Sequence, residues 1–144
     1  MIFETFIYLS LKKKVRYRMV KFSVSQDEIR KVDNFLRGYQ LNQKLLKLDR
    51  YERNFLGYRA SEESFSGDIP MAKAKMFEIR HFITDLENGD EKLLLYYHYV
   101  RGETVEKCAE LLGISRSSGF RLKKRALCMA ATEYGKVKSV KNMI

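Results

Sequence analysis

An all-α fold is the class that this sequence predicts, and three observations point to it. The 144-residue chain contains a single proline, so long stretches lack the residue that most strongly breaks helices. Its composition, 45% hydrophobic and 32% charged, is typical of a globular protein rather than a disordered one. Apolar residues recur at intervals of three and four along much of the chain, which is the spacing of one helix face. The length predicts about one domain.

The N-terminal extension, residues 1–24, differs from the rest in composition. An apolar run over residues 2–11 is followed by five cations, Lys12, Lys13, Lys14, Arg16 and Arg18. This run is too short to span a bilayer, which takes about 20 apolar residues, and its charge order is the reverse of a secretory signal. A membrane-surface anchor remains an alternative, but we expect no membrane partner and a cytoplasmic location. We also expect the true start at Met19, because codons for residues 13–16 could form a purine-rich ribosome-binding site.

Residues 25–89 are expected to form a helical region, in which the first helix begins at Ser25. Ser25 and Glu28 have the spacing of a capping box, and Gly38 is expected to stop or kink this helix. A second amphipathic helix is expected at about residues 40–56. Its apolar stripe consists of Leu41, Leu45, Leu48 and Phe55. The stripe belongs either to a core helix or to a coiled-coil arm for dimerisation or a partner, and two heptads are too few to decide.

A third helix is expected after a Ser- and Gly-rich loop over residues 57–68. Pro70 suits its first turn, where a missing amide costs nothing. Gly89 is expected to end this helix in a left-handed conformation. Its stripe is formed by Met76, Ile79, Ile83 and Leu86. We expect it to pair with the second helix as an antiparallel hairpin.

The C-terminal part, residues 90–134, divides into three expected helices. Helix-capping residues precede each helix, and glycines that can adopt a positive φ follow the first two. These residues are, in order, Asp90, Gly102, Thr104, Gly113 and Ser115. The small Ala109 and the apolar Leu122 have the spacing at which two short helices cross. The pattern predicts a helix-turn-helix, followed by a basic tail over residues 135–144.

The last of these helices has an outer face whose chemistry suits DNA. Arginine can hold guanine through two hydrogen bonds, and serine can bond to bases or phosphates. We therefore expect Arg116 and Arg121 to contact base edges and Lys124 to contact a phosphate. The full set of expected DNA-binding residues is Thr104, Ser115, Arg116, Ser117, Ser118, Phe120, Arg121, Lys123, Lys124 and Arg125. The alternative is a basic, solvated helix of a bundle.

The charge distribution favours a polyanionic partner. The chain has a net charge of +10, and residues 115–144 carry eight cations and one anion. Such residues bind duplex DNA by displacing its condensed counterions. Either charged end taken alone could equally be a solvated face.

No residue constellation in the sequence points to catalysis. Cys108 and Cys128 lack the paired spacing of a zinc site, and we expect both to be reduced thiols. His81 and His98 have no nearby cluster of ligating residues, so packing or surface roles are expected for them. A glycine-rich phosphate loop is also absent from the sequence. We expect no enzyme activity, no metal and no cofactor.

Residues 93–127, LLLYYHYVRGETVEKCAELLGISRSSGFRLKKRAL, resemble the fourth region of bacterial sigma factors. The chain from about Ser25 resembles phage-encoded transcriptional regulators of the ArpU and RinA type. The resemblance implies a sigma-like helix-turn-helix, activation of phage late genes and contacts to RNA polymerase. One departure is Gly119, where a β-branched residue is usual. Glycine costs about 1 kcal/mol of helix propensity, and we expect it to leave the inner face underfilled.

The predicted function is regulation of transcription by sequence-specific binding of double-stranded DNA, with a homodimer as one expected assembly. Two alternatives stay open. A small terminase subunit of a phage packaging motor also joins a helix-turn-helix to an oligomerising hairpin, and it would form a larger ring. A protein-binding helical adaptor would show no salt-dependent affinity for DNA.

Overall fold

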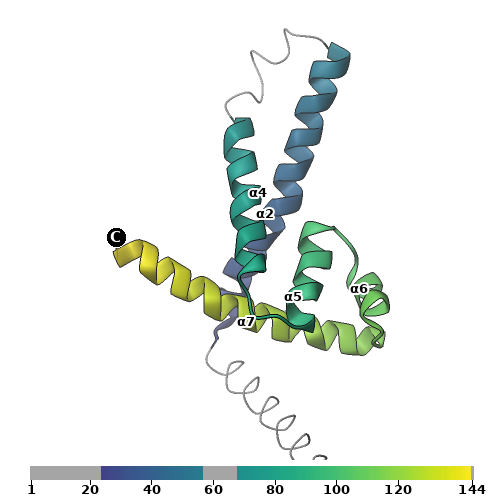
Figure 1. Ribbon diagram of the computed structural model, residues 1–144, viewed down its shortest axis with the longest axis vertical. Helices are drawn as coiled ribbons and strands as arrows, with labels where there is room; N and C mark the ends of the chain where they lie inside the picture. Colours follow the sequence, from purple (N-terminus) through teal and green to yellow (C-terminus); the bar gives the residue numbers. More distant parts are fainter. Residues whose placement is uncertain (1–23, 57–67, 144) are drawn as a thin grey trace, which may run out of the picture.

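The computed structural model describes residues 24–56 and 68–143, and all regular elements within these ranges are helical (Figure 1). The all-α prediction is confirmed for this part of the chain. The expectations for residues 1–23, including the start at Met19, and for the loop over residues 57–67 lie outside the described residues. None of the described helices is long and apolar enough to cross a membrane.

Helix α2 (Gln26–Tyr51) continues into the π-helical segment η1 (Glu52–Leu56). It begins where the sequence predicted, because the hydroxyl of Ser25 accepts a hydrogen bond from the backbone N–H of Glu28 at 3.2 Å. The predicted stop or kink at Gly38 is wrong, and the two helices expected before and after it are one. Gly38 lies against helix α4, where an added Cβ would be 3.3 Å from Cδ1 of Ile79. The glycine therefore allows two helices to approach each other.

Helix α4 (Asp68–Thr84) runs back alongside α2, so the two helices form an antiparallel pair that projects from the rest of the molecule (Figure 1). Pro70 lies in the first turn of α4, as predicted. The predicted left-handed stop at Gly89 is wrong. The helix ends at Thr84, and Gly89 has an extended backbone with φ 166°.

The C-terminal part contains α5 (Asp90–Leu95), the π-helical segment η2 (Tyr96–Val100), α6 (Val105–Leu112) and α7 (Arg116–Met143). The prediction that Asp90 caps α5 is wrong, because Gly89 occupies the cap position and no side chain caps the helix. Asp90 lies in the first turn instead, where a negative charge suits the helix dipole. Gly102, at φ 74°, follows η2 as predicted. Helix α7 passes through Gly135, so the expected basic tail continues the helix as far as Met143.

One hydrophobic core joins the α2–α4 pair to the C-terminal helices. Its members come from α2, α4, α5, η2, α6 and α7, together with Leu86 between α4 and α5. The largest fully buried side chains are Leu36, Ile79, Leu94, Leu95, Val32 and Cys108. The regions on either side of residue 89 therefore share their interior, and the domain boundary expected there stays a prediction.

A polar junction also holds α2 against η2. The hydroxyl of Tyr99 donates to Oδ1 of Asp33 at 2.5 Å, and Arg37 pairs with the other carboxylate oxygen at 2.9 Å. Gln40 donates from Nε2 to the carbonyl of Val100 at 2.6 Å. Burial raises the pKa of the Tyr99 hydroxyl, and its hydrogen bond to Asp33 raises it further, so the phenol keeps its proton. These contacts fix the position of η2, which precedes α6.

Candidate nucleic-acid interface

Helices α6 and α7 are joined by a tight turn of three residues, and both helices are capped as the sequence predicted. The hydroxyl of Thr104 accepts a hydrogen bond from the backbone N–H of Lys107 at 3.1 Å. Gly113 takes φ 71° at the end of α6. Ser115 Oγ then accepts the backbone N–H of Ser118 at 3.2 Å. The backbone of the turn is thus set by local hydrogen bonds and by one left-handed glycine.

The two helices cross where Gly119 of α7 meets Ala109 of α6. A Cβ added to Gly119 would lie 2.9 Å from Cβ of Ala109, closer than real Cβ atoms come, and Gly119 is buried. The expectation that this glycine leaves the inner face underfilled is therefore wrong. Leu122 and Ala126 are buried on the same face, as predicted. The tight crossing determines the direction in which the opposite face of α7 points.

The outer face of α7 carries most of the predicted DNA-binding residues. Arg116, Ser117, Phe120, Arg121, Lys124 and Arg125 are all exposed. Ser118 and Lys123 are half-buried at its edge. Between residues 115 and 132 the sequence has five cations and no anion. The structure thus brings the cations of this part of α7 together with one exposed aromatic ring.

Three hydroxyls cluster at the start of α7. Ser115 Oγ lies 2.9 Å from Oγ of Ser118 and 3.4 Å from Oγ of Ser117. Thr104 is separated from this cluster by the whole of α6, and its hydroxyl already caps that helix. Of the ten predicted residues, Thr104 is therefore the one least integrated into the basic face.

Sequence reasoning missed Glu106, which contacts the predicted site. Its Oε1 lies 3.2 Å from a terminal guanidinium nitrogen of Arg116, and this pair bridges α6 and the start of α7. The two residues are ten positions apart across the turn, so no helical spacing rule would pair them. Arg121 is held differently, because its Nε donates to the backbone carbonyl of Ser117 at 3.4 Å.

The surroundings of His98, Cys108 and Cys128 favour roles in packing rather than in chemistry. Nδ1 of His98 lies 2.7 Å from the carbonyl of Glu103, and burial lowers the pKa of this half-buried imidazole. Burial raises the pKa of the Cys108 thiol, which makes it a poor nucleophile. Cys128 is also buried, and neither cysteine forms a disulfide. Within the described residues, no three His, Cys, Asp or Glu side chains are grouped so that they could hold a metal ion.

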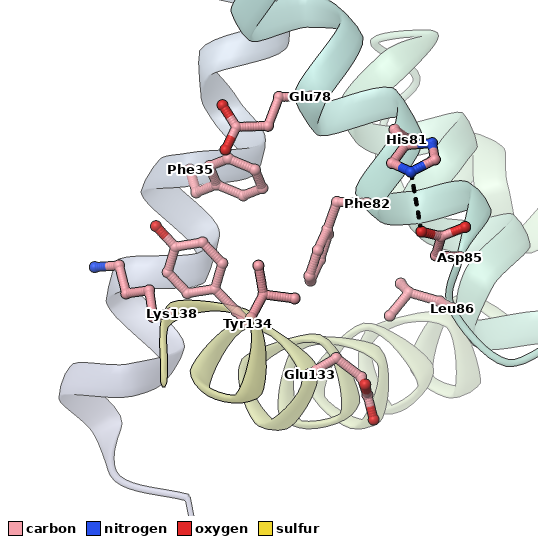
Figure 2. A pocket seen from close by; sticks show the side chains of 10 residues that line it. Phe35, Glu78, His81, Phe82, Asp85, Leu86, Glu133, Tyr134 and Lys138 are labelled. Atoms are coloured by element: carbon pink, nitrogen blue, oxygen red, sulfur yellow. Dashed lines mark ion pairs between the residues drawn. The ribbon is translucent and has the colours of Figure 1, made fainter. Parts of the chain in front are cut away.

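A cavity lies between α2, α4 and the C-terminal half of α7, away from the turn between α6 and α7 (Figure 2). This cavity of about 420 Å³ is lined by the rings of Phe35, Phe82 and Tyr134, with Phe35 and Tyr134 4.8 Å apart. Carboxylates of Glu78, Asp85 and Glu133 also line it. The three carboxylates outnumber the one lysine of the lining, Lys138, so the charge of the cavity does not suit a phosphate backbone. The cavity is therefore not part of the candidate interface.

Comparison with protein-family models, with curated proteins and with solved structures gives no match to this chain.

Proposed function

We propose that this protein regulates transcription by binding duplex DNA, with α6, the turn and the first half of α7 acting as a helix-turn-helix. One observation carries the proposal. A helix fixed from behind by the close contact of Gly119 with Ala109 presents a basic outer face, to which residues 115–132 contribute five cations and no anion. A rigid helix with this charge suits the major groove, which is about 12 Å wide and admits one α-helix.

Position along α7 suggests how the contacts divide. The N-terminal turns of a recognition helix meet base edges, while residues further along face the backbone. Arg116 and Arg121 are therefore assigned to bases, and the exposed ring of Phe120 suits a thymine methyl group. Lys124 lies one turn further along and is assigned to a phosphate.

The ion pair of Glu106 with Arg116 bears on specificity. Both side chains are largely exposed, so breaking the pair costs at most about 1 kcal/mol. On the correct sequence, a bidentate bond to guanine more than offsets this loss. On other sequences Arg116 gains less, and the carboxylate of Glu106 repels nearby phosphates. Glu106 thus weakens binding to incorrect sequences more than binding to the correct one.

The test first identifies a selected DNA site by sequencing the fragments that the purified protein retains. The affinity of each variant for this site and for random DNA is then measured at several salt concentrations. Arg116→Ala and Arg121→Ala should each cost about 1 to 3 kcal/mol on the selected site and much less on random DNA. Lys124→Ala should weaken both equally and lower the slope of log affinity against log salt by about one. Lys73→Ala, on the exposed surface of α4, is the matched control and should change neither.

The outcomes separate the hypotheses. Equal losses on both DNAs for Arg116, Arg121 and Lys124 would show that these arginines do not contact bases. A protein without salt-dependent DNA affinity would refute the proposed function and favour a protein-binding adaptor. Activation of phage late genes and contact with RNA polymerase are further parts of the proposal, and reporter transcription from a promoter carrying the selected site tests them.

A small terminase subunit remains the second candidate, and the exposed apolar side chains on the distal half of α2 favour it. Such a subunit also binds DNA, but it assembles into a ring. The mass of the assembly separates the two candidates.

A further inference from the structure

The distal half of α2 and the segment η1 leave an apolar stripe uncovered. Leu41 is 69% exposed, Leu48 54%, Tyr51 56% and Phe55 73%. Leu45 lies beside them and is half-buried. Single exposed apolar residues are ordinary, but a contiguous row of them marks an interaction surface.

Leu45 borders the face that packs against α4, and the four exposed side chains of the stripe lie away from that face. The α4 side of α2 is marked by Gly38, where an added Cβ would lie 3.3 Å from Cδ1 of Ile79. Leu41 and Leu48 are seven residues apart in α2, so they lie on one side of this helix with a drift of about 20°, and the exposed Phe55 follows in η1. Packing within the chain therefore leaves the stripe without a partner among the described residues.

Positions of the stripe at equal sequence distances before and after Leu48 are both apolar. Leu41 mirrors Phe55, and Leu45 mirrors Tyr51. Two charges within the stripe are mirrored with opposite sign, because Lys44 and Glu52 are each four residues from Leu48. An isologous interface needs this property, since residue i contacts residue j while j contacts i.

We propose that the occupant of this stripe is a second copy of the chain, docked antiparallel with the two-fold axis passing beside Leu48. Leu48 then packs against Leu48 of the partner subunit, and Leu41 packs against Phe55 of the partner subunit. Lys44 faces Glu52 of the partner subunit, and the symmetry repeats this ion pair. A parallel arrangement would instead place Lys44 against Lys44 of the partner subunit. The charges therefore select the antiparallel pairing.

The inference goes beyond the proposed function, because the mass of the protein is measured without DNA. If the chain also binds DNA, a two-fold dimer presents two recognition helices. Its selected sites should then be pseudo-palindromic, with two half-sites. A failure of DNA binding would leave the dimer proposal intact, and a monomer could still bind DNA.

The first experiment measures mass by light scattering and sedimentation at micromolar concentrations. The wild-type protein should have twice the chain mass of 17.0 kDa. Leu48→Glu places two carboxylates at the axis and should give the monomer mass, with helicity by circular dichroism unchanged because Leu48 is exposed. The control, Phe77→Glu, changes an equally large side chain on α4 that is 71% exposed, and it should remain a dimer.

The second experiment reverses charges. Lys44→Glu should raise the dissociation constant of the dimer about tenfold, because two attractions between subunits become repulsions. Glu52→Lys should do the same, and the double variant should recover most of the wild-type affinity. Glu52 also interacts within its own chain, so recovery in the double variant is the decisive observation.

A monomeric wild-type protein, a larger ring, or an unchanged mass for Leu48→Glu would overturn the proposal. Additive weakening in the charge-reversed double variant would also overturn it, because the mirrored ion pairs would then not exist.

Discussion

Replacing Gly119 by alanine tests the closeness of the contact between α6 and α7. In an exposed helix this change is stabilising, because alanine has the higher helix propensity by about 1 kcal/mol. At Gly119 the added methyl would lie 2.9 Å from Cβ of Ala109. Neither atom can rotate away, since both are attached directly to a helix backbone. Relief requires the helices to separate.

The two effects oppose each other, and their sizes decide the sign. Overpacking of this kind costs about 1 to 3 kcal/mol, against a gain of about 1 kcal/mol from propensity. Gly119→Ala should therefore lower the free energy of unfolding by up to about 2 kcal/mol. Gly135→Ala is the matched control in the same helix, because a Cβ there has nothing within 4 Å. It should raise the free energy of unfolding by about 1 kcal/mol.

Urea and thermal unfolding of the two variants measure the difference directly. For a chain of this size their melting temperatures should differ by roughly 3 to 10 °C. Adding Ala109→Gly should relieve the Gly119→Ala clash, with a coupling energy of about 1 kcal/mol or more in a double-mutant cycle. If Gly119→Ala stabilised the protein as much as Gly135→Ala, the close crossing would be refuted.

Two further predictions concern Tyr99 and His98, which both lie in η2. Tyr99→Phe should lower the free energy of unfolding by about 1 to 2 kcal/mol in urea unfolding, because the part-buried carboxylate of Asp33 loses a donor at 2.5 Å. An unchanged unfolding midpoint would argue against this bond. Stability should also fall as pH drops below 6.5, the ordinary pKa of histidine, because burial lowers the folded-state pKa of His98 and only the unfolded chain takes up the proton readily. The loss should level off below the folded-state pKa. His98→Asn, whose amide can still donate to the carbonyl of Glu103, should remove this step, and identical pH profiles for the two proteins would contradict the assignment.

The capping residues were predictable because their effects are local. Ser25, Thr104 and Ser115 each bond a backbone amide within the next three residues, as the sequence spacing indicated. The positive φ of Gly113 was predictable for a similar reason, because a glycine directly after a helix often adopts the left-handed conformation. At Asp90 the rule failed, since an acidic residue favours both the cap and the first turn of a helix and the sequence does not distinguish them.

Glycines within helices were the main source of error, for one physical reason. Sequence rules treat glycine as a weak point of a helix, because it lacks a side chain and has excess backbone freedom. At Gly38 and Gly119 the missing Cβ instead provides room for a side chain from another helix, Ile79 or Ala109. Which role applies depends on contacts between residues far apart in the chain. Gly135, which also lies within a helix but has nothing within 4 Å of an added Cβ, shows that the sequence around a glycine does not reveal which role applies.

The stripe from Leu41 to Phe55 shows what a periodic pattern leaves undecided. Its period indicated correctly that the side chains share one face, but period alone does not say what covers that face. The structure narrows the choice between a core role and an interaction surface, because α4 packs on the side of Gly38 and leaves Leu41, Leu48 and Phe55 exposed. A core role for the whole stripe is then ruled out, although half-buried Leu45 borders the core side. The mirrored charges of Lys44 and Glu52 become informative only after this step. On a buried face they would have to serve packing within the chain, whereas on an exposed face they can select the orientation of a partner.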